Sequence, residues 1–209
     1  MQHSFFVEPK PYAIDKRALK RRVLIYLNVH NSQFAIRYFN RLKSIQQNIV
    51  LKIKDTARFQ SPKDAFRFAA KSLNTNDNTH DSNNDYDECW VVLESLPHLH
   101  SEIQQVFEEG RKKNVHVIFC NCSFELWVLL HFRDITKIEK TTRPTLWNEM
   151  IITRNLSELD ILEHISIKDN MKAAIERAKH LYKEQGGVDS WKANPATNFF
   201  ELMESIFTR

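Results

Sequence analysis

Glycine is scarce in this 209-residue sequence, which contains three, Gly110, Gly186 and Gly187, and none before residue 110. Loops that cradle the phosphates of a nucleotide need glycine, because their backbone adopts positive φ and approaches the phosphate closely. Neither a Walker A motif nor the glycine-rich dinucleotide fingerprint can be written anywhere in the chain. The sequence therefore excludes a P-loop NTPase and a Rossmann dehydrogenase of the usual type.

Cysteine is also scarce, and long apolar runs are missing. Cys89, Cys120 and Cys122 lie inside apolar segments, which does not resemble a disulfide framework and fits a reducing compartment. No stretch approaches the ~20 apolar residues of a membrane helix. The first residues also lack the apolar stretch and small-residue cleavage site of a signal peptide. We therefore expect a cytoplasmic protein without membrane contact.

The charges are distributed unevenly along the chain. Residues 1–72 carry 15 Lys and Arg against 4 Asp and Glu, a net charge of +11, whereas the remaining 137 residues carry 15 against 22, a net −7, which gives +4 in total. This asymmetry favours a basic surface for an anionic partner, either nucleic acid or an acidic protein. The alternative is that the two halves attract each other, within the chain or across a homodimer.

Apolar runs alternate with segments of helical spacing. Short, continuous apolar runs are typical of strands that are covered on both faces of a sheet. Four such runs occur, at residues 23–27, 49–53, 89–93 and 115–120. Segments with helical spacing are residues 34–45, a stretch from residue 62 onward, 101–110 with its end at Gly110, and 124–132 with Ser123 as its cap. Strands alternating with helices predict an α/β fold with a four-stranded parallel sheet and right-handed crossovers.

The chain is predicted to have three parts. Residues 1–22 read as a basic N-terminal arm, residues 23–132 as an α/β core, and residues 133–209 as a helical C-terminal extension packing on that core. Within the extension, residues 166–185 show the spacing of an amphipathic helix, and another helix follows Asn194-Pro195. Residues 133–165 show neither the spacing of a helix nor that of a strand clearly.

Ligands of open parallel sheets bind outside the carboxyl ends of the strands. The segment at residues 121–132, which follows the fourth predicted strand, reads NCSFELWVLLHF. It is similar to the signature Asn-Pro-x-Phe-Glu-Leu-Trp-Leu-Leu-Leu-His-Phe of RloB-like proteins. Weaker similarities follow in the same order: VLIYLNVHNS from residue 23, YDECWVV from residue 86, and NPAT from residue 194. The chain thus resembles the RloB-like family over about residues 20–205.

The resemblance implies a toprim-like, Rossmann-like fold and a role beside a partner ATPase or another protein of a bacterial anti-phage system. Toprim nucleases place a Glu after the first strand and an Asp-x-Asp after the third, because hard divalent cations need several oxygen ligands. This chain has Asn28 at the first place and Glu94-Ser95-Leu96 at the second. One carboxylate of the three remains, so we expect impaired catalysis and no cofactor.

Two alternatives to a non-catalytic binding protein stay open. The first is an active nuclease in which Glu94 and Glu125 hold Mg²⁺ or Mn²⁺. The second is a purely protein-binding regulatory partner of an ATPase. Glu125 has a structural explanation as well, because it lies in the first turn of its helix, where the helix dipole favours a negative charge.

Basic residues that could hold nucleic acid are found in three groups. Lys63, Arg67 and Lys71 recur at intervals of four residues and place like charges on one helix ridge, a cost that a phosphate backbone would offset. A solvated helix face is the alternative. The full predicted set is Lys20, Arg21, Arg22, Arg37, Arg41, Lys63, Arg67 and Lys71.

Overall fold

The computed structural model describes residues 20–74, 86–94, 99–136 and 140–207. The strands are β1 Arg21–Asn28, β2 Ile49–Asp55, β3 Glu88–Glu94, β4 His116–Asn121 and β5 Ala196–Thr197. The α-helices are α1 Ser32–Ile45, α2 Pro62–Asn74, α3 His100–Lys113, α4 Phe124–Leu129, α5 Arg143–Asn148, α6 Glu158–Ile165, α7 Lys168–Glu184 and α8 Phe199–Phe207. A π-helical turn, η3 (Glu149–Thr153), and a 3₁₀ helix, η4 (Gly187–Lys192), complete the described elements.

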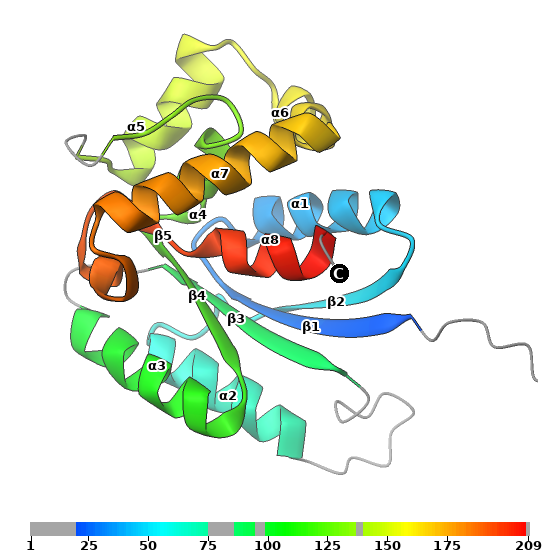
Figure 1. Cartoon of the computed structure of the whole chain (residues 1–209), viewed down its shortest axis with the longest axis vertical. Helices are drawn as coiled ribbons and strands as arrows, with labels where there is room; N and C mark the ends of the chain where they lie inside the picture. Colours follow the sequence, from blue (N-terminus) through cyan, green and yellow to red (C-terminus); the bar gives the residue numbers. More distant parts are fainter. Residues whose placement is uncertain (1–19, 75–85, 95–98, 137–139, 208–209) are drawn as a thin grey trace, which may run out of the picture.

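The sheet has the strand order β2-β1-β3-β4-β5 (Figure 1). The strands β1 to β4 are parallel, and they correspond to the four predicted apolar runs. The short β5 pairs antiparallel with the end of β4, with Cys120 opposite Thr197. The predicted α/β fold with a mainly parallel sheet flanked by helices is therefore confirmed, but the predicted number of four strands is wrong. A two-residue strand is too short to leave a periodic signal in the sequence.

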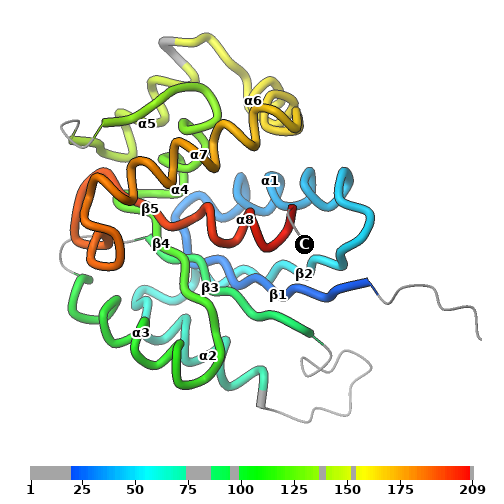
Figure 2. Tube along the Cα trace, in the orientation of Figure 1, coloured from blue at the N-terminus to red at the C-terminus, as the bar shows by residue number. Residues whose placement is uncertain are grey.

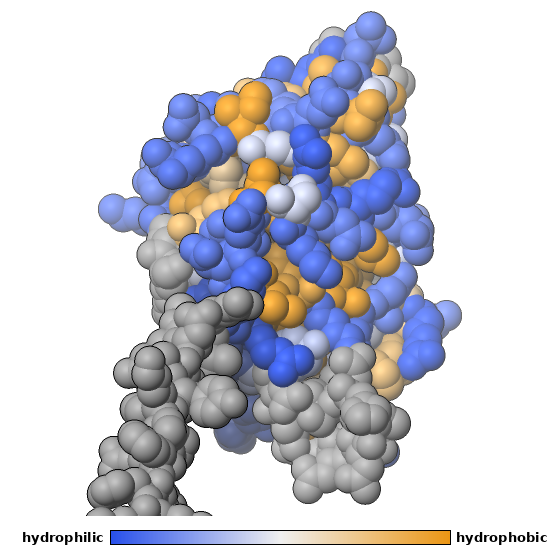
Figure 3. Space-filling model, turned by 90° about the vertical axis from the view of Figure 1, so that its right-hand side faces the viewer, coloured by the Kyte–Doolittle hydropathy of each residue, from blue (hydrophilic) through white to orange (hydrophobic). Residues whose placement is uncertain are grey.

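The sheet separates two apolar cores, because successive side chains of a strand point to opposite faces. On β1, Ile25 and Leu27 join the core beneath α1, α4 and the C-terminal helices, whereas Leu24 and Tyr26 join the core shared with α2 and α3. The trace in Figure 2 shows the helices in two layers, one on each side of the sheet. Hydrophobic side chains reach the surface in small groups among hydrophilic ones on the face shown in Figure 3.

The C-terminal helix α8 belongs to the same core as α1, although the two lie at opposite ends of the chain. Phe199 of α8 is fully buried, and its ring centroid lies 6.1 Å from that of Phe39 of α1. Just before α8, the buried amide of Asn198 donates to the carbonyl of Val117 at 3.0 Å and accepts the N–H of Phe119 at 2.8 Å. Residues beyond position 132 thus complete both the sheet and its core.

The helix predicted to end at Gly110 continues through it to Lys113 and ends at Asn114, whose φ of 53° lies in the left-handed region. That part of the prediction is wrong. Gly110 is buried where α3 approaches β4, and a Cβ there would lie 2.7 Å from the carbonyl oxygen of Val115 and 2.9 Å from a methyl group of Val117. The glycine permits close helix–strand packing rather than a helix end.

Residues 1–19 of the predicted basic arm lie outside the described residues. In the described ranges, no helix is both long enough and apolar enough to span a membrane.

Replacing Gly110 with Ala tests this packing. An exposed Gly→Ala change inside a helix normally stabilises by up to ~1 kcal/mol. Here the added methyl group overlaps the backbone of Val115, so we expect the free energy of unfolding to fall by about 1–3 kcal/mol. Thermal denaturation should show a lower Tm for Gly110→Ala, whereas the exposed change Lys112→Ala on the same helix should leave Tm nearly unchanged. A raised Tm for Gly110→Ala would contradict the close approach.

Candidate functional site

Glu94 is the last residue of β3 and lies at the carboxyl end of the sheet with 8% of its surface exposed. One carboxylate oxygen accepts the backbone N–H of Phe124, the first residue of α4, at 3.2 Å. The other accepts a guanidinium N–H of Arg143, the first residue of α5, at 3.0 Å. A single buried carboxylate therefore joins the central strand β3 to two helices.

The N-terminus of α4 is capped by a different side chain from the predicted one. Ser123 does occupy the N-cap position, but its hydroxyl makes no capping hydrogen bond. Glu94 supplies the oxygen that the first N–H of the helix needs. A carboxylate is favoured there because the N–H groups of a helix's first turn have no partner within the helix.

Burial raises the pKa of the Glu94 carboxyl above its usual range, because the charged form loses its hydration. The positive charge of Arg143 and the backbone N–H groups of Phe124 and His30 lower this pKa, and the nearby carboxylate of Glu125 raises it. Two acids therefore lie close together in a poorly hydrated site, and Arg143 is the cation that offsets their charge.

Glu125 is 1% exposed and follows Phe124 in the first turn of α4. Its Oε2 atom is buried without a hydrogen-bond partner among the described residues. Other atoms of the same region share this property, namely Asn121 Oδ1, Ser123 Oγ and Arg143 Nε. Buried polar groups normally find a partner in protein, water or ligand. Residues 121–125 and Arg143 thus form one part of the described fold in which several buried polar atoms still have hydrogen-bonding capacity.

The residues at this site do not fit a resident Mg²⁺ or Mn²⁺ ion. Such ions require about six oxygen ligands in a near-octahedral arrangement, of which a protein commonly supplies one or two carboxylates while water and substrate phosphates supply the rest. Here two carboxylates are present, and one of them, Glu94, already pairs with Arg143. Within the part of the chain that the structure describes, no group of three His, Cys, Asp or Glu side chains is arranged to hold a metal ion.

The structure brings Glu94 and Glu125 together but places Asn28 elsewhere. Asn28 is paired in register with Leu93, so its side chain points to the opposite face of the sheet from Glu94. Its amide donates to the carbonyls of Thr56 at 2.8 Å and Phe59 at 2.9 Å. Asn28 therefore fastens the segment between β2 and α2.

The basic residues of α1 contact the C-terminal part of the chain. Arg37 forms an ion pair with Glu158 of α6 at 2.5 Å, and Arg41 donates to the hydroxyl of Ser166 at 2.6 Å. Both contacts fasten α6 and the segment after it to α1. These two arginines have internal partners that explain their presence.

The other predicted basic residues lie at the start of β1 and on α2. Arg21 pairs with Glu88 at 3.3 Å, and Lys63 donates to the side chain of Gln105 on α3. Arg22 lies over the ring of Tyr86, and Arg67 pairs with Asp64 at 3.6 Å. Lys20 and Lys71 are exposed. Because α1 and α2 cover opposite faces of the sheet (Figure 1), their basic residues do not form one continuous surface.

Sequence reasoning missed Arg143, because residues 133–165 gave no periodic pattern. A local signal was present: Thr142, Pro144 and Thr145 form a capping box with proline in the first turn, which marks the start of α5. That signal could have located the helix. It could not have shown that its first residue reaches Glu94, which lies 49 positions away in the chain.

A comparison with protein-family models identifies the family of this chain. The model of the RloB-like protein family matches residues 35–206, which is most of the chain. The chain belongs to the RloB-like family. The RloB-like match contains Glu94, Glu125 and Arg143, whereas Asn28 precedes its first residue. No curated protein and no solved structure matches the chain.

The change Arg143→Gln tests the role of this arginine. When the pKa of a carboxyl group is higher in the folded protein than in the unfolded chain, the free energy of unfolding falls as the pH rises from the lower pKa to the higher one. Removing Arg143 raises the pKa of Glu94 further, so the variant should be destabilised more at high pH than at low pH. Because Arg143 is partly exposed, we expect the loss of a buried acceptor's donor to cost about 1–3 kcal/mol at pH 8 and less at pH 5.

Thermal denaturation of the wild type and the variant at both pH values measures this difference. Arg67→Gln serves as a matched control, because it breaks an exposed pair that contributes ~0–1 kcal/mol. Equal losses for Arg143→Gln at pH 5 and pH 8 would show that the Glu94 charge is not what Arg143 stabilises.

Proposed function

We propose that this RloB-like chain is a non-catalytic, toprim-like protein of the cytoplasm that binds nucleic acid within a bacterial anti-phage system. The observation that carries the proposal is the ion pair between Arg143 and the buried Glu94 at the carboxyl end of β3. A toprim nuclease would need a divalent cation at that place. An arginine supplies a fixed positive charge there, but it has no open coordination position with which to polarise a phosphodiester.

The local residues support this reading in two further ways. The acid expected after β1 is replaced by Asn28, whose amide is bonded to backbone carbonyls on the other face of the sheet. The acids expected after β3 are reduced to Glu94. Because Glu94 already pairs with Arg143, a cation at this place would have to displace the arginine before both Glu94 and Glu125 could bind it.

The charge distribution favours an anionic partner, and nucleic acid is the anionic partner that we propose. The net +11 of residues 1–72 is a large excess for a chain of this size, and binding to a phosphate backbone releases counterions. A partner ATPase of the same defence system would be a second component of the assembly. A purely protein-binding role is the alternative when nucleic acid does not bind.

An active nuclease is the second candidate. The unpartnered Oε2 of the buried Glu125 favours it, because such an atom has capacity for a cation or a proton donor. In that case Glu94 and Glu125 would hold Mg²⁺ or Mn²⁺ after Arg143 has moved away from Glu94.

Calorimetric titration with Mn²⁺ distinguishes the two candidates. For the non-catalytic protein we expect no binding at micromolar concentrations and no cleavage of DNA or RNA with Mg²⁺ or Mn²⁺ present, because Arg143 holds Glu94 and the described residues around it include no third carboxylate. Glu94→Ala is the control, since it removes the central ligand. A micromolar dissociation constant that Glu94→Ala abolishes, together with cleavage, would establish the nuclease instead.

A further inference from the structure

Three aromatic rings lie in contact on the α2 side of the sheet, next to the edge strand β2. The ring centroids of Phe59 and Phe68 are 5.3 Å apart, and Phe68 meets Tyr26 edge to face at 6.1 Å. Phe59 comes from the segment before α2, Phe68 from α2 itself and Tyr26 from β1. Phe59 and Phe68 are half-buried, so part of each ring remains accessible to a ligand.

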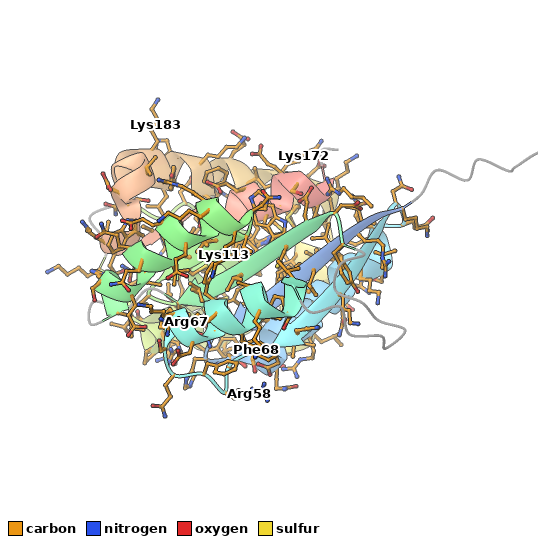
Figure 4. All side chains as sticks on the ribbon, turned by 90° about the horizontal axis from the view of Figure 1, so that it is seen from below. Arg58, Arg67, Phe68, Lys113, Lys172 and Lys183 are labelled. Atoms are coloured by element: carbon orange, nitrogen blue, oxygen red, sulfur yellow. The ribbon has the colours of Figure 1, made fainter. Side chains whose placement is uncertain are left out.

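A cation lies over each part of this aromatic cluster. The guanidinium carbon of Arg58 is 5.0 Å from the centre of the Phe59 ring and 5.2 Å from that of Phe68. The ammonium of Lys54 is 5.5 Å from the Tyr26 ring. Arg58 is exposed, and in the described part of the chain its guanidinium makes no hydrogen bond or ion pair. Figure 4 shows Arg58 and Phe68 together beside α2, with Arg67 on the same helix.

Neighbouring acids offset only part of this positive charge, because Asp55 and Asp64 are two carboxylates against the four cations Lys54, Arg58, Arg67 and Lys71. The carboxylate of Asp55 is used within the chain, since it accepts the hydroxyl of Ser32 and the N–H of Ala57, both at 2.8 Å. Asp64 pairs with Arg67 at 3.6 Å in an exposed position, where such a pair contributes little. Lys71 adds a further positive charge one turn beyond Arg67. The surface around the rings is therefore positive.

This combination has a structural explanation and a functional one. Arginine side chains often cover apolar rings with their stems, which would explain Arg58 by packing alone. Packing does not explain why, among the described residues, no carboxylate pairs with this guanidinium while further cations follow on α2. Partly exposed aromatic rings and cations that contact the phosphate backbone are the features with which proteins hold single-stranded nucleic acid, because every base has a π-face.

We propose that Arg58, Phe59 and Phe68 form a stacking site for the bases of single-stranded DNA or RNA, with Arg67 and Lys71 contacting the adjacent phosphates. The proposal rests on the proposed nucleic-acid binding and specifies its surface and the strand form of the ligand. Duplex bases are already stacked on each other, so the rings would contribute little to duplex binding.

Fluorescence anisotropy with the full chain tests the site, using labelled 20-nucleotide oligo-dT, oligo-U and a 20-base-pair duplex at several salt concentrations. Arg58→Ala and Phe68→Leu should each weaken single-strand binding about tenfold, the effect of losing one stacked base. Phe68→Leu keeps an apolar side chain at the packing position and should leave the salt dependence unchanged. The double change of Arg67 and Lys71 to Gln should reduce the salt slope by about two.

Lys172→Ala is the matched control, because Lys172 is an exposed lysine of α7 on the opposite face of the sheet (Figure 4). It should leave binding unchanged. If Phe68→Leu fails to fold, as judged by its Tm, the exposed change Arg58→Ala carries the test. Wild-type binding to a single strand that neither variant weakens would overturn the stacking site but leave the proposed function standing. Absence of wild-type binding to all three probes at low salt would overturn both.

Discussion

A carboxylate at the end of a fully covered strand is the constraint on which the site depends. The strand β3 is buried along almost its whole length, so Glu94 is largely removed from water and needs partners within the protein. It finds them in the first N–H of α4 and in the guanidinium of Arg143. Breaking such a buried pair is costly, because the remaining charge has no solvent to stabilise it. The positions of α4 and α5 follow from this requirement.

The family signature can be divided by what each residue contacts. Trp127 donates its indole N–H to the hydroxyl of Tyr38 at 2.7 Å and stacks on Phe199 with centroids 4.8 Å apart. His131 is buried among the same rings, and burial lowers its pKa to about 3, so it is neutral at physiological pH. These residues hold α4 against α1 and α8. Among the described residues Glu125 makes no comparable contact, so packing does not explain its carboxylate.

The excess of positive charge in the first third of the chain has more than one role. Arg37 and Arg41 connect α1 to the C-terminal part, which carries the excess of acids, and this agrees with the alternative that the two halves attract each other. The cations near α2, by contrast, lie beside aromatic rings and on an exposed helix. A net charge therefore indicates a tendency to bind anions, and only the individual partners of each side chain show which residues are available for it.

The sequence alone determined the alternation of strands and helices, because apolar spacing reports which face of each segment is buried. It also indicated the RloB-like family through residues 121–132, and it led to Glu94 and Glu125 through their positions after strands. It could not assign β5, whose two residues carry no period, or the role of Gly110, which depends on the distance between α3 and β4. The pairing of Glu94 with Arg143 and the separation of Asn28 from both were decided by tertiary structure. Contacts between residues far apart in the chain depend on how the strands are ordered and on which face each side chain points to, and no local pattern records either.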